Sequence, residues 1–138
     1  MTSAGALLYA SNTRRFLFLL RNNTRTRDTW GLPGGKLHLD EAVMVGLHRE
    51  ITEELGPIPE VKKYIPLEVF TSFDGEFRYH SFIFVLENEF MPTLNDEHGG
   101  YAWAAIDRFP KPLHPGLYQS LSIEVIREKI RVVKDSLL

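Results

Sequence analysis

Residues 41–55 constrain the fold of this chain most, because they predict an amphipathic helix whose two ends are marked in the sequence. Asp40 has a side chain suited to capping the helix start, and Gly56 followed by Pro57 is typical of a helix end. The apolar residues of this segment recur every four positions, at Val43, Leu47, Ile51 and Leu55. The helix is therefore expected to carry one apolar stripe along its length.

Runs of strand-forming residues lie on both sides of this helix and are separated by turn signals. The expected strands cover residues 4–10, 16–21, 67–73, 77–86 and 102–106. Asp74-Gly75 predicts a hairpin turn, and residues 117–137 predict a second helix. This order favours the α/β (α+β) class, with a mixed sheet covered by helices on its faces. We see no repeat and no linker, so we expect a single domain over residues 1–138.

The composition is that of an ordinary globular protein, and it excludes several functions. The 138 residues include 16 basic and 18 acidic side chains, so the net charge of −2 does not favour binding to nucleic acid or to an anionic membrane. The chain has no cysteine, which excludes disulfides, thiolate metal ligands and cysteine nucleophiles. No targeting segment is visible, and the longest apolar runs, residues 16–20 and 82–86, have strand length. We therefore expect a cytoplasmic protein without membrane contact.

Acidic residues concentrate on and around the predicted helix. Residues 37–61 contain six acidic side chains and one basic side chain, that of Arg49. Glu50, Glu53 and Glu54 have the spacing i, i+3 and i+4, which places them on one helix face beside the apolar stripe. A solvated acidic face is one explanation, but like charges one turn apart each cost a helix about 0.2–0.5 kcal/mol. The other explanation is a site for a hard divalent cation such as Mg²⁺, which takes oxygen ligands.

The residues around this acidic face follow a fixed pattern. Gly35 is followed after five residues by Glu41, and after seven more by Arg49-Glu50-Ile51-Thr52-Glu53-Glu54-Leu55-Gly56. This pattern resembles the Nudix box of the Nudix (MutT-like) hydrolases, and Trp30-Gly31-Leu32-Pro33-Gly34-Gly35 extends the resemblance. Pro57 after the box and Asp40 before it depart from the usual pattern without removing a ligand. The resemblance implies a Nudix-type α/β/α sandwich with a mixed β-sheet between helices.

The resemblance also implies an activity and a metal. Nudix enzymes hydrolyse a phosphoanhydride bond in a nucleoside diphosphate linked to another group, in a site that holds Mg²⁺ or Mn²⁺. The implied metal ligands are the Gly35 carbonyl group, Glu50, Glu53 and Glu54. Glu53 also matches a residue that is the catalytic base in some members, and Arg49 matches one that orients the glutamates. Glu41 matches a charged residue that supports the loop.

A second match to the family lies further along the chain. Glu97 precedes Trp103 by six residues, in a segment expected to be a loop that leads into a strand. Many Nudix proteins carry a glutamate at this place, where it is an additional metal ligand or the general base. An acidic residue in a surface loop is the alternative explanation, and Asp96 is a neighbour that could substitute for Glu97.

Four residues in or near the glycine-rich segment are candidates for substrate binding: Arg21, Arg25, Trp30 and Gly34. Arginine suits bidentate contacts to phosphate, although a solvated loop also explains the two arginines. Trp30 can stack on a base or pack in the core, and glycines such as Gly34 let the backbone approach a ligand. His114 is a further candidate for a general base, as in a Nudix subfamily that acts on nucleotide sugars.

Together these features favour a Mg²⁺- or Mn²⁺-dependent pyrophosphohydrolase that acts on a nucleotide-type small molecule. A (d)NTP is the first substrate to consider, because the chain is short like the MutT-type enzymes; a nucleotide sugar or ADP-ribose is the alternative. A nucleotide-sensing module of the same fold is a second alternative. Such modules typically lose box glutamates, all of which are present here. Family members are often dimers, so a homodimer is an open possibility.

Overall fold

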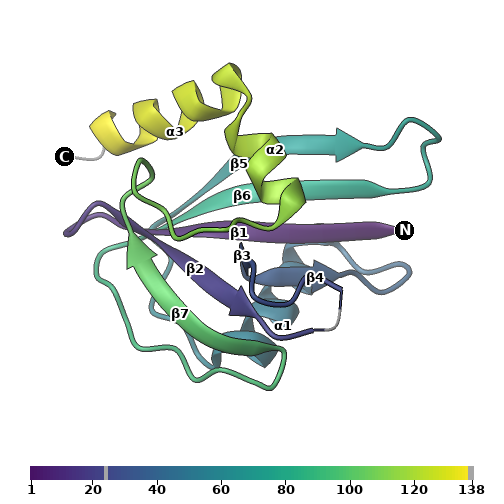
Figure 1. Ribbon diagram of the computed structural model, residues 1–138, viewed down its shortest axis with the longest axis horizontal. Helices are drawn as coiled ribbons and strands as arrows, with labels where there is room; N and C mark the ends of the chain where they lie inside the picture. The colour runs from purple at the N-terminus through teal and green to yellow at the C-terminus, as the bar shows by residue number, and fades with distance from the viewer. Residues whose placement is uncertain (24, 137–138) are drawn as a thin grey trace.

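A mixed β-sheet lies between helices in this protein (Figure 1). The computed structural model describes residues 1–23 and 25–136. In this part of the chain the strands are β1 (Thr2–Ala10), β2 (Arg15–Arg21), β3 (Trp30–Gly31), β4 (Gly34–Lys36), β5 (Lys63–Thr71), β6 (Arg78–Leu86) and β7 (His98–Ala104). The helices there are α1 (Val43–Leu55), α2 (Pro115–Leu121) and α3 (Glu124–Ser136). The main strand order is β3-β2-β1-β6-β5, with β4 paired to β1 and β7 paired to β2.

Strand pairing explains why the sheet is mixed. β1 runs parallel to β6 along its whole length and antiparallel to β2 and β4. β5 and β6 form an antiparallel hairpin around Asp74-Gly75, as the sequence predicts. The central position of β1 is consistent with its composition, since most of its side chains are fully buried.

The two faces of the sheet carry separate hydrophobic cores. Leu7 and Tyr9 of β1 belong to a core that includes α2 and α3, whereas Ala6 and Leu8 belong to a core that includes α1. Alternate residues of a strand point to opposite faces, so one strand supplies both cores. Figure 1 shows α2 in front of the sheet and α1 behind it. The predicted α/β/α sandwich of the α+β class is therefore confirmed.

The predicted start of the first helix is wrong by two residues. α1 begins at Val43, and Ala42 is its N-cap, without a capping side chain. Asp40 instead adopts a positive φ of 65° in the preceding turn. The turn is held by Glu41, whose carboxylate accepts a hydrogen bond of 2.8 Å from the backbone N–H of His38. The predicted end is confirmed, because α1 ends at Leu55 and Gly56 follows as its C-cap.

The second predicted helix is two helices, and the last predicted strand begins earlier than expected. The break lies between Leu121 and Glu124, where the hydroxyl of Ser122 donates to the carbonyl of Tyr118 at 2.7 Å. A serine hydroxyl that bonds its own helix backbone competes with helix continuation. Residue 137 of the predicted helix lies outside the described residues. β7 begins at His98 rather than at residue 102, because pairing to β2 extends the strand.

The described helices are too short or too polar to cross a membrane.

Candidate active site

The three box glutamates of α1 have very different environments. Glu54 is almost completely buried, with 2% of its surface exposed. The side chain of Glu50 is 16% exposed and that of Glu53 is 55% exposed. All three follow the helix spacing that the sequence predicts, but only Glu50 and Glu54 are turned toward the interior.

Residues 33–35, called the glycine turn below, bend at Pro33 into the start of β4 and lie directly against these two carboxylates. The backbone N–H of Gly34 donates to Oε1 of Glu54 at 2.7 Å. Gly35 is so close to Glu50 that an added Cβ would lie 2.6 Å from its Oε2. Gly34 has a φ of 139°, and a Cβ there would lie 2.1 Å from the carbonyl oxygen of Ala4. The sequence therefore places two of the predicted ligands around a turn that only glycine can form.

Arg49 connects the glutamates to the loop before α1. Its Nε and Nη2 atoms bind the carboxylate of Glu41 at 2.8 and 3.0 Å. Its Nη1 atom donates to Glu50 at 3.1 Å and to Glu53 at 3.2 Å, and Nη2 also reaches the carbonyl of Lys36. The hydrogen bonds from Arg49 hold the pKa of Glu41 at about 2. This geometry is what a residue that orients the glutamates requires.

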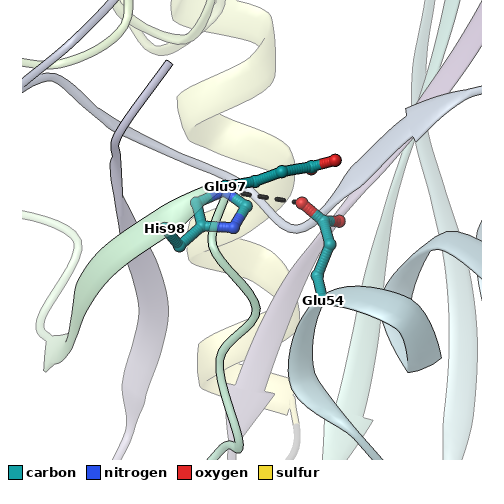
Figure 2. Close-up of side chains that lie close together, drawn as sticks. All are labelled: Glu54, Glu97 and His98. Atoms are coloured by element: carbon teal, nitrogen blue, oxygen red, sulfur yellow. Dashed lines mark ion pairs between the residues drawn. The ribbon is translucent and has the colours of Figure 1, made fainter.

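The side chains of Glu97 and His98, at the start of β7, lie close to Glu54 (Figure 2). One ligand atom each from Glu54, Glu97 and His98 lie within 4.8 Å of one another. Nε2 of His98 is 3.4 Å from Oε2 of Glu54, and each of these two side chains is only 3% exposed. Glu97 is exposed, and its backbone carbonyl accepts a hydrogen bond from Asn22 that holds the loop beside β2. Glu97, from the sequence pattern, thus meets Glu54 across the site.

His98 was missed in the sequence analysis. Its only local signal is its place next to Glu97 at the start of a strand. Because neighbouring residues at a strand start face opposite ways, an exposed Glu97 implies a buried residue at 98. Whether that residue meets Glu54 depends on how β7 pairs with β2, where His98 is opposite Arg21.

Burial sets the charges of this cluster. Burial is the main cause that raises the pKa of Glu54 to about 8, against the backbone hydrogen bond from Gly34, and the nearby carboxylates of Glu97 and Glu50 contribute to the rise. Burial lowers the pKa of His98 to about 4, with a smaller effect from the charge of Arg21. At neutral pH Glu54 therefore holds a proton and His98 is neutral.

These donor groups fit a divalent cation. Carboxylates are the oxygen ligands that Mg²⁺ and Mn²⁺ take, whereas the imidazole of His98 is a ligand type better suited to softer metals such as Zn²⁺. Nδ1 of His98 is buried and has no hydrogen-bond partner among the described residues. A cation here would replace the proton on Glu54, and so remove the cause of its raised pKa.

A prediction about pH follows for the metal-free protein. The folded protein keeps a proton on Glu54 up to about pH 8, which the unfolded chain releases near 4.5. The free energy of unfolding should therefore fall as pH rises. Below its ordinary pKa of 6.5, His98 has the opposite effect, because the unfolded chain protonates it more readily than the folded protein does. The net fall in the free energy of unfolding is therefore expected between pH 6.5 and 8. Urea unfolding in EDTA at several pH values across this range measures the free energy of unfolding. Glu54→Gln should flatten the profile, and a flat profile in the unmodified protein would contradict the assignment.

A cavity of about 470 Å³ opens next to the glycine turn, between the sheet and α2. Its end at the turn is lined by Arg21, Gly34, Gly35 and Lys36. His114 also lines the cavity, but its Nδ1 accepts a hydrogen bond of 3.1 Å from the N–H of Gly116 and so caps α2. The cavity thus has two basic side chains at the end formed by Gly34 and Gly35, the glycines that lie against Glu54 and Glu50.

Two predicted substrate residues lie elsewhere. Arg25 is exposed in the loop after β2 and is not part of the cavity lining. Trp30 packs against the hydrophobic core that includes α2 and α3. Its backbone binds the loop before α2, accepting from the N–H of His114 and donating to the carbonyl of Pro112. Trp30 therefore supports the loop before α2 and is not among the residues that line the cavity, whereas Arg21 and Gly34 are.

Comparisons with known proteins identify the family. The family model of the NUDIX domain matches residues 1–122, and the chain belongs to this family. The chain is 37% identical over 75 residues to the ADP-ribose pyrophosphatase of Methanocaldococcus jannaschii. The aligned residues are 53% of this chain and 43% of that protein. The match therefore spans less than half the length of this curated relative.

Solved structures agree with this assignment. The chain is 27% identical to the MutT NUDIX hydrolase from Burkholderia pseudomallei, with a TM-score of 0.68 over 88% of this chain and 95% of that one. The Nudix hydrolase RenU from M. smegmatis is 22% identical, with a TM-score of 0.76 over 99% of this chain and 87% of that one. At this lower identity the second likeness concerns the fold alone.

Proposed function

We propose that this chain is a divalent-metal-dependent pyrophosphohydrolase that cleaves a phosphoanhydride bond in a nucleoside diphosphate linked to another group. The observation that carries the proposal is the buried carboxylate of Glu54. It accepts from the Gly34 N–H on one side and meets Glu97 and His98 on the other. A buried acid with a raised pKa is typical of a functional site, and the glycine that donates to Glu54 lines the cavity. The complete set of box glutamates argues against a module that only senses nucleotides.

The residues that would hold the cation are the Gly35 carbonyl group, Glu50 and Glu54, with Glu53 as a further ligand of the family pattern. A bound Mg²⁺ or Mn²⁺ would neutralise phosphate oxygens and lower the pKa of an attacking water. Arg49 keeps Glu50 in place through its hydrogen bond of 3.1 Å. Arg21 and Lys36, at the turn end of the cavity, supply positive charge for the remaining phosphate oxygens.

Glu97 is the better placed of the two candidate bases. Its ligand atom lies within 4.8 Å of that of Glu54, and its side chain is open to solvent. Glu53 points to the exposed side of α1, where its carboxylate is bound by Arg49. We therefore assign the proton from the attacking water to Glu97, and Glu53 to a supporting position.

Two classes of substrate are considered for this chain, a (d)NTP and ADP-ribose. One lead is a (d)NTP, because the chain is similar to a MutT NUDIX hydrolase, and the other is ADP-ribose, because the curated relative is an ADP-ribose pyrophosphatase. The experiment is a panel of (d)NTPs, ADP-ribose and nucleotide sugars, incubated with Mg²⁺ or Mn²⁺ and with EDTA as the control. Release of pyrophosphate identifies a (d)NTP, and release of AMP with ribose 5-phosphate identifies ADP-ribose. No hydrolysis of any compound with either metal would overturn the proposed function and favour the sensing module.

The cellular setting is also part of the proposal. The absence of cysteine is compatible with a reducing compartment, and we place the activity in the cytoplasm. A homodimer, common in the family, is tested by sedimentation of the purified chain.

Arg21 gives a prediction that separates substrate binding from metal binding. Its Nε atom is held by Thr26 at 2.6 Å, which aims the guanidinium group at the cavity. Arg21→Gln should raise KM about tenfold, because one charge-assisted phosphate contact is lost. The affinity for Mn²⁺ should change much less. Steady-state kinetics measure the first effect and a Mn²⁺ titration the second. An unchanged KM would remove Arg21 from the phosphate site.

A further inference from the structure

The end of the cavity away from the glycine turn contains a carboxylate that the metal site does not use. Glu68 lines this end, next to Leu67 on β5. Neighbouring residues of a regular strand face opposite sides, so both would not normally border one cavity. The pairing of β5 with β6 shifts register between Pro66 and Glu68, and this irregularity allows both to do so.

Among the described residues, only one of the two carboxylate oxygens of Glu68 has a hydrogen-bond partner. Its Oε1 accepts a hydrogen bond of 2.6 Å from the hydroxyl of Ser120 on α2. Within residues 1–23 and 25–136, no lysine, arginine or histidine forms an ion pair with Glu68. Lys129 donates to the carbonyl of the neighbouring Leu67 at 2.9 Å. The second carboxylate oxygen, Oε2, is thus available as an acceptor in a partly buried place.

Aromatic side chains line the same cavity as this carboxylate. Phe70, Phe77 and Tyr79 line the cavity, with ring centroids 6.3 Å apart for the first pair and 6.5 Å for the second. Apolar residues of α2, including Leu117 and Leu121, form the opposite wall. An apolar and aromatic cavity with one free polar acceptor suits a flat heteroaromatic ring that carries an N–H donor.

The same cavity borders the two glycines that lie against the carboxylates of Glu54 and Glu50. It is lined at one end by Gly34, Gly35 and Arg21 and at the other by Glu68. Between these two ends, the hydroxyl group of Tyr79 packs directly on Gly5 of β1. A Cβ atom added to Gly5 would lie 1.9 Å from the Tyr79 hydroxyl oxygen. A nucleotide with its phosphates at the glycine turn would therefore extend its base toward Glu68.

We propose that Glu68 is the specificity residue for the base, and that it selects purines with an exocyclic amino group, which donates to its free oxygen. This inference rests on the proposed function only in taking the ligand to be a nucleotide. An ionised carboxylate only accepts hydrogen bonds, so it favours adenine over unsubstituted purine and guanine over hypoxanthine. The structural alternative is that Glu68 merely fastens α2 to β5 through Ser120.

The test measures binding without turnover. The affinities of AMP, purine riboside monophosphate, GMP and IMP are measured in EDTA by calorimetry. The unmodified protein should bind the amino-bearing member of at least one pair about tenfold more tightly, and the preferred pair identifies the purine. Equal affinity within both pairs, or no detectable binding of any member, would overturn the proposal.

Substitutions separate recognition from fastening. In Glu68→Gln the side-chain oxygen still accepts from Ser120, so the amide presents donors to the base, and the preference should be lost or reversed. Ser120→Ala keeps the carboxylate and should keep the preference, and Glu76→Gln, in the exposed hairpin turn, is the matched control. If Glu68→Gln lowers only the melting temperature and leaves the preference intact, the fastening role is correct and the proposal fails. Hydrolysis by the panel above is independent of this result, so failure of one does not imply failure of the other.

Discussion

Glu54→Gln is expected to reduce hydrolysis by about 100-fold or more, since a Lewis-acid metal contributes several kcal/mol and each 1.4 kcal/mol is a factor of ten. Glutamine has nearly the same shape and its oxygen can still accept from the Gly34 N–H. It also removes an acid whose ionisation is opposed by burial. The variant should therefore remain folded while losing activity. Steady-state hydrolysis with Mg²⁺, and urea unfolding on the same preparation, measure the two effects.

The control for this variant is Glu60→Gln, which removes an exposed carboxylate just beyond α1. It should leave both hydrolysis and unfolding unchanged. Full Mg²⁺-dependent activity in Glu54→Gln would show that this carboxylate does not serve the reaction. A loss of activity with a matching loss of folded protein would instead make Glu54 a structural residue.

Gly34→Ala is expected to lower the free energy of unfolding by about 3 kcal/mol or more, because both its backbone conformation and its neighbours exclude a side chain. The residue has a φ of 139°, and a Cβ would lie 2.1 Å from the carbonyl oxygen of Ala4 and 2.6 Å from Cα of Gly5. These are backbone atoms of the central strand β1, which cannot move without disturbing its pairing with β4 and β6. Denaturant unfolding measures the loss.

Gly75→Ala is the matched control for the glycine turn. Gly75 also has a positive φ, of 76°, but nothing lies within 4 Å of an added Cβ. It should lose only the conformational part, about 1–2 kcal/mol. If the two alanine variants are equally stable, the close contact between Gly34 and β1 has no energetic consequence.

Local sequence was sufficient to predict the elements that have regular periodicity. The four-residue spacing of Leu47, Ile51 and Leu55 predicts the buried stripe of α1, and those residues are fully buried or nearly so. The same spacing predicts that Glu50 and Glu54 share a side of the helix, which the contacts with the glycine turn agree with. It could not predict that Glu54 is buried and Glu53 exposed, since that depends on where the glycine turn and the loop before β7 lie.

The rest of the site depends on contacts between distant segments. His98 reaches Glu54 only because β7 pairs with β2, and a single histidine gives no sign of this. The cavity requires the break at Ser122 between α2 and α3 and the register shift before Glu68. Both arise from packing and strand pairing, which no short sequence motif records.

The most direct test of the account is Mn²⁺ binding, measured from the electron paramagnetic resonance signal of the free ion, because it asks whether Glu50 and Glu54 hold a cation together. The unmodified protein should remove free Mn²⁺ from solution, Glu50→Gln and Glu54→Gln should each weaken binding by tenfold or more, and Glu60→Gln should bind like the unmodified protein. Undiminished Mn²⁺ affinity in both Glu50→Gln and Glu54→Gln would contradict the account.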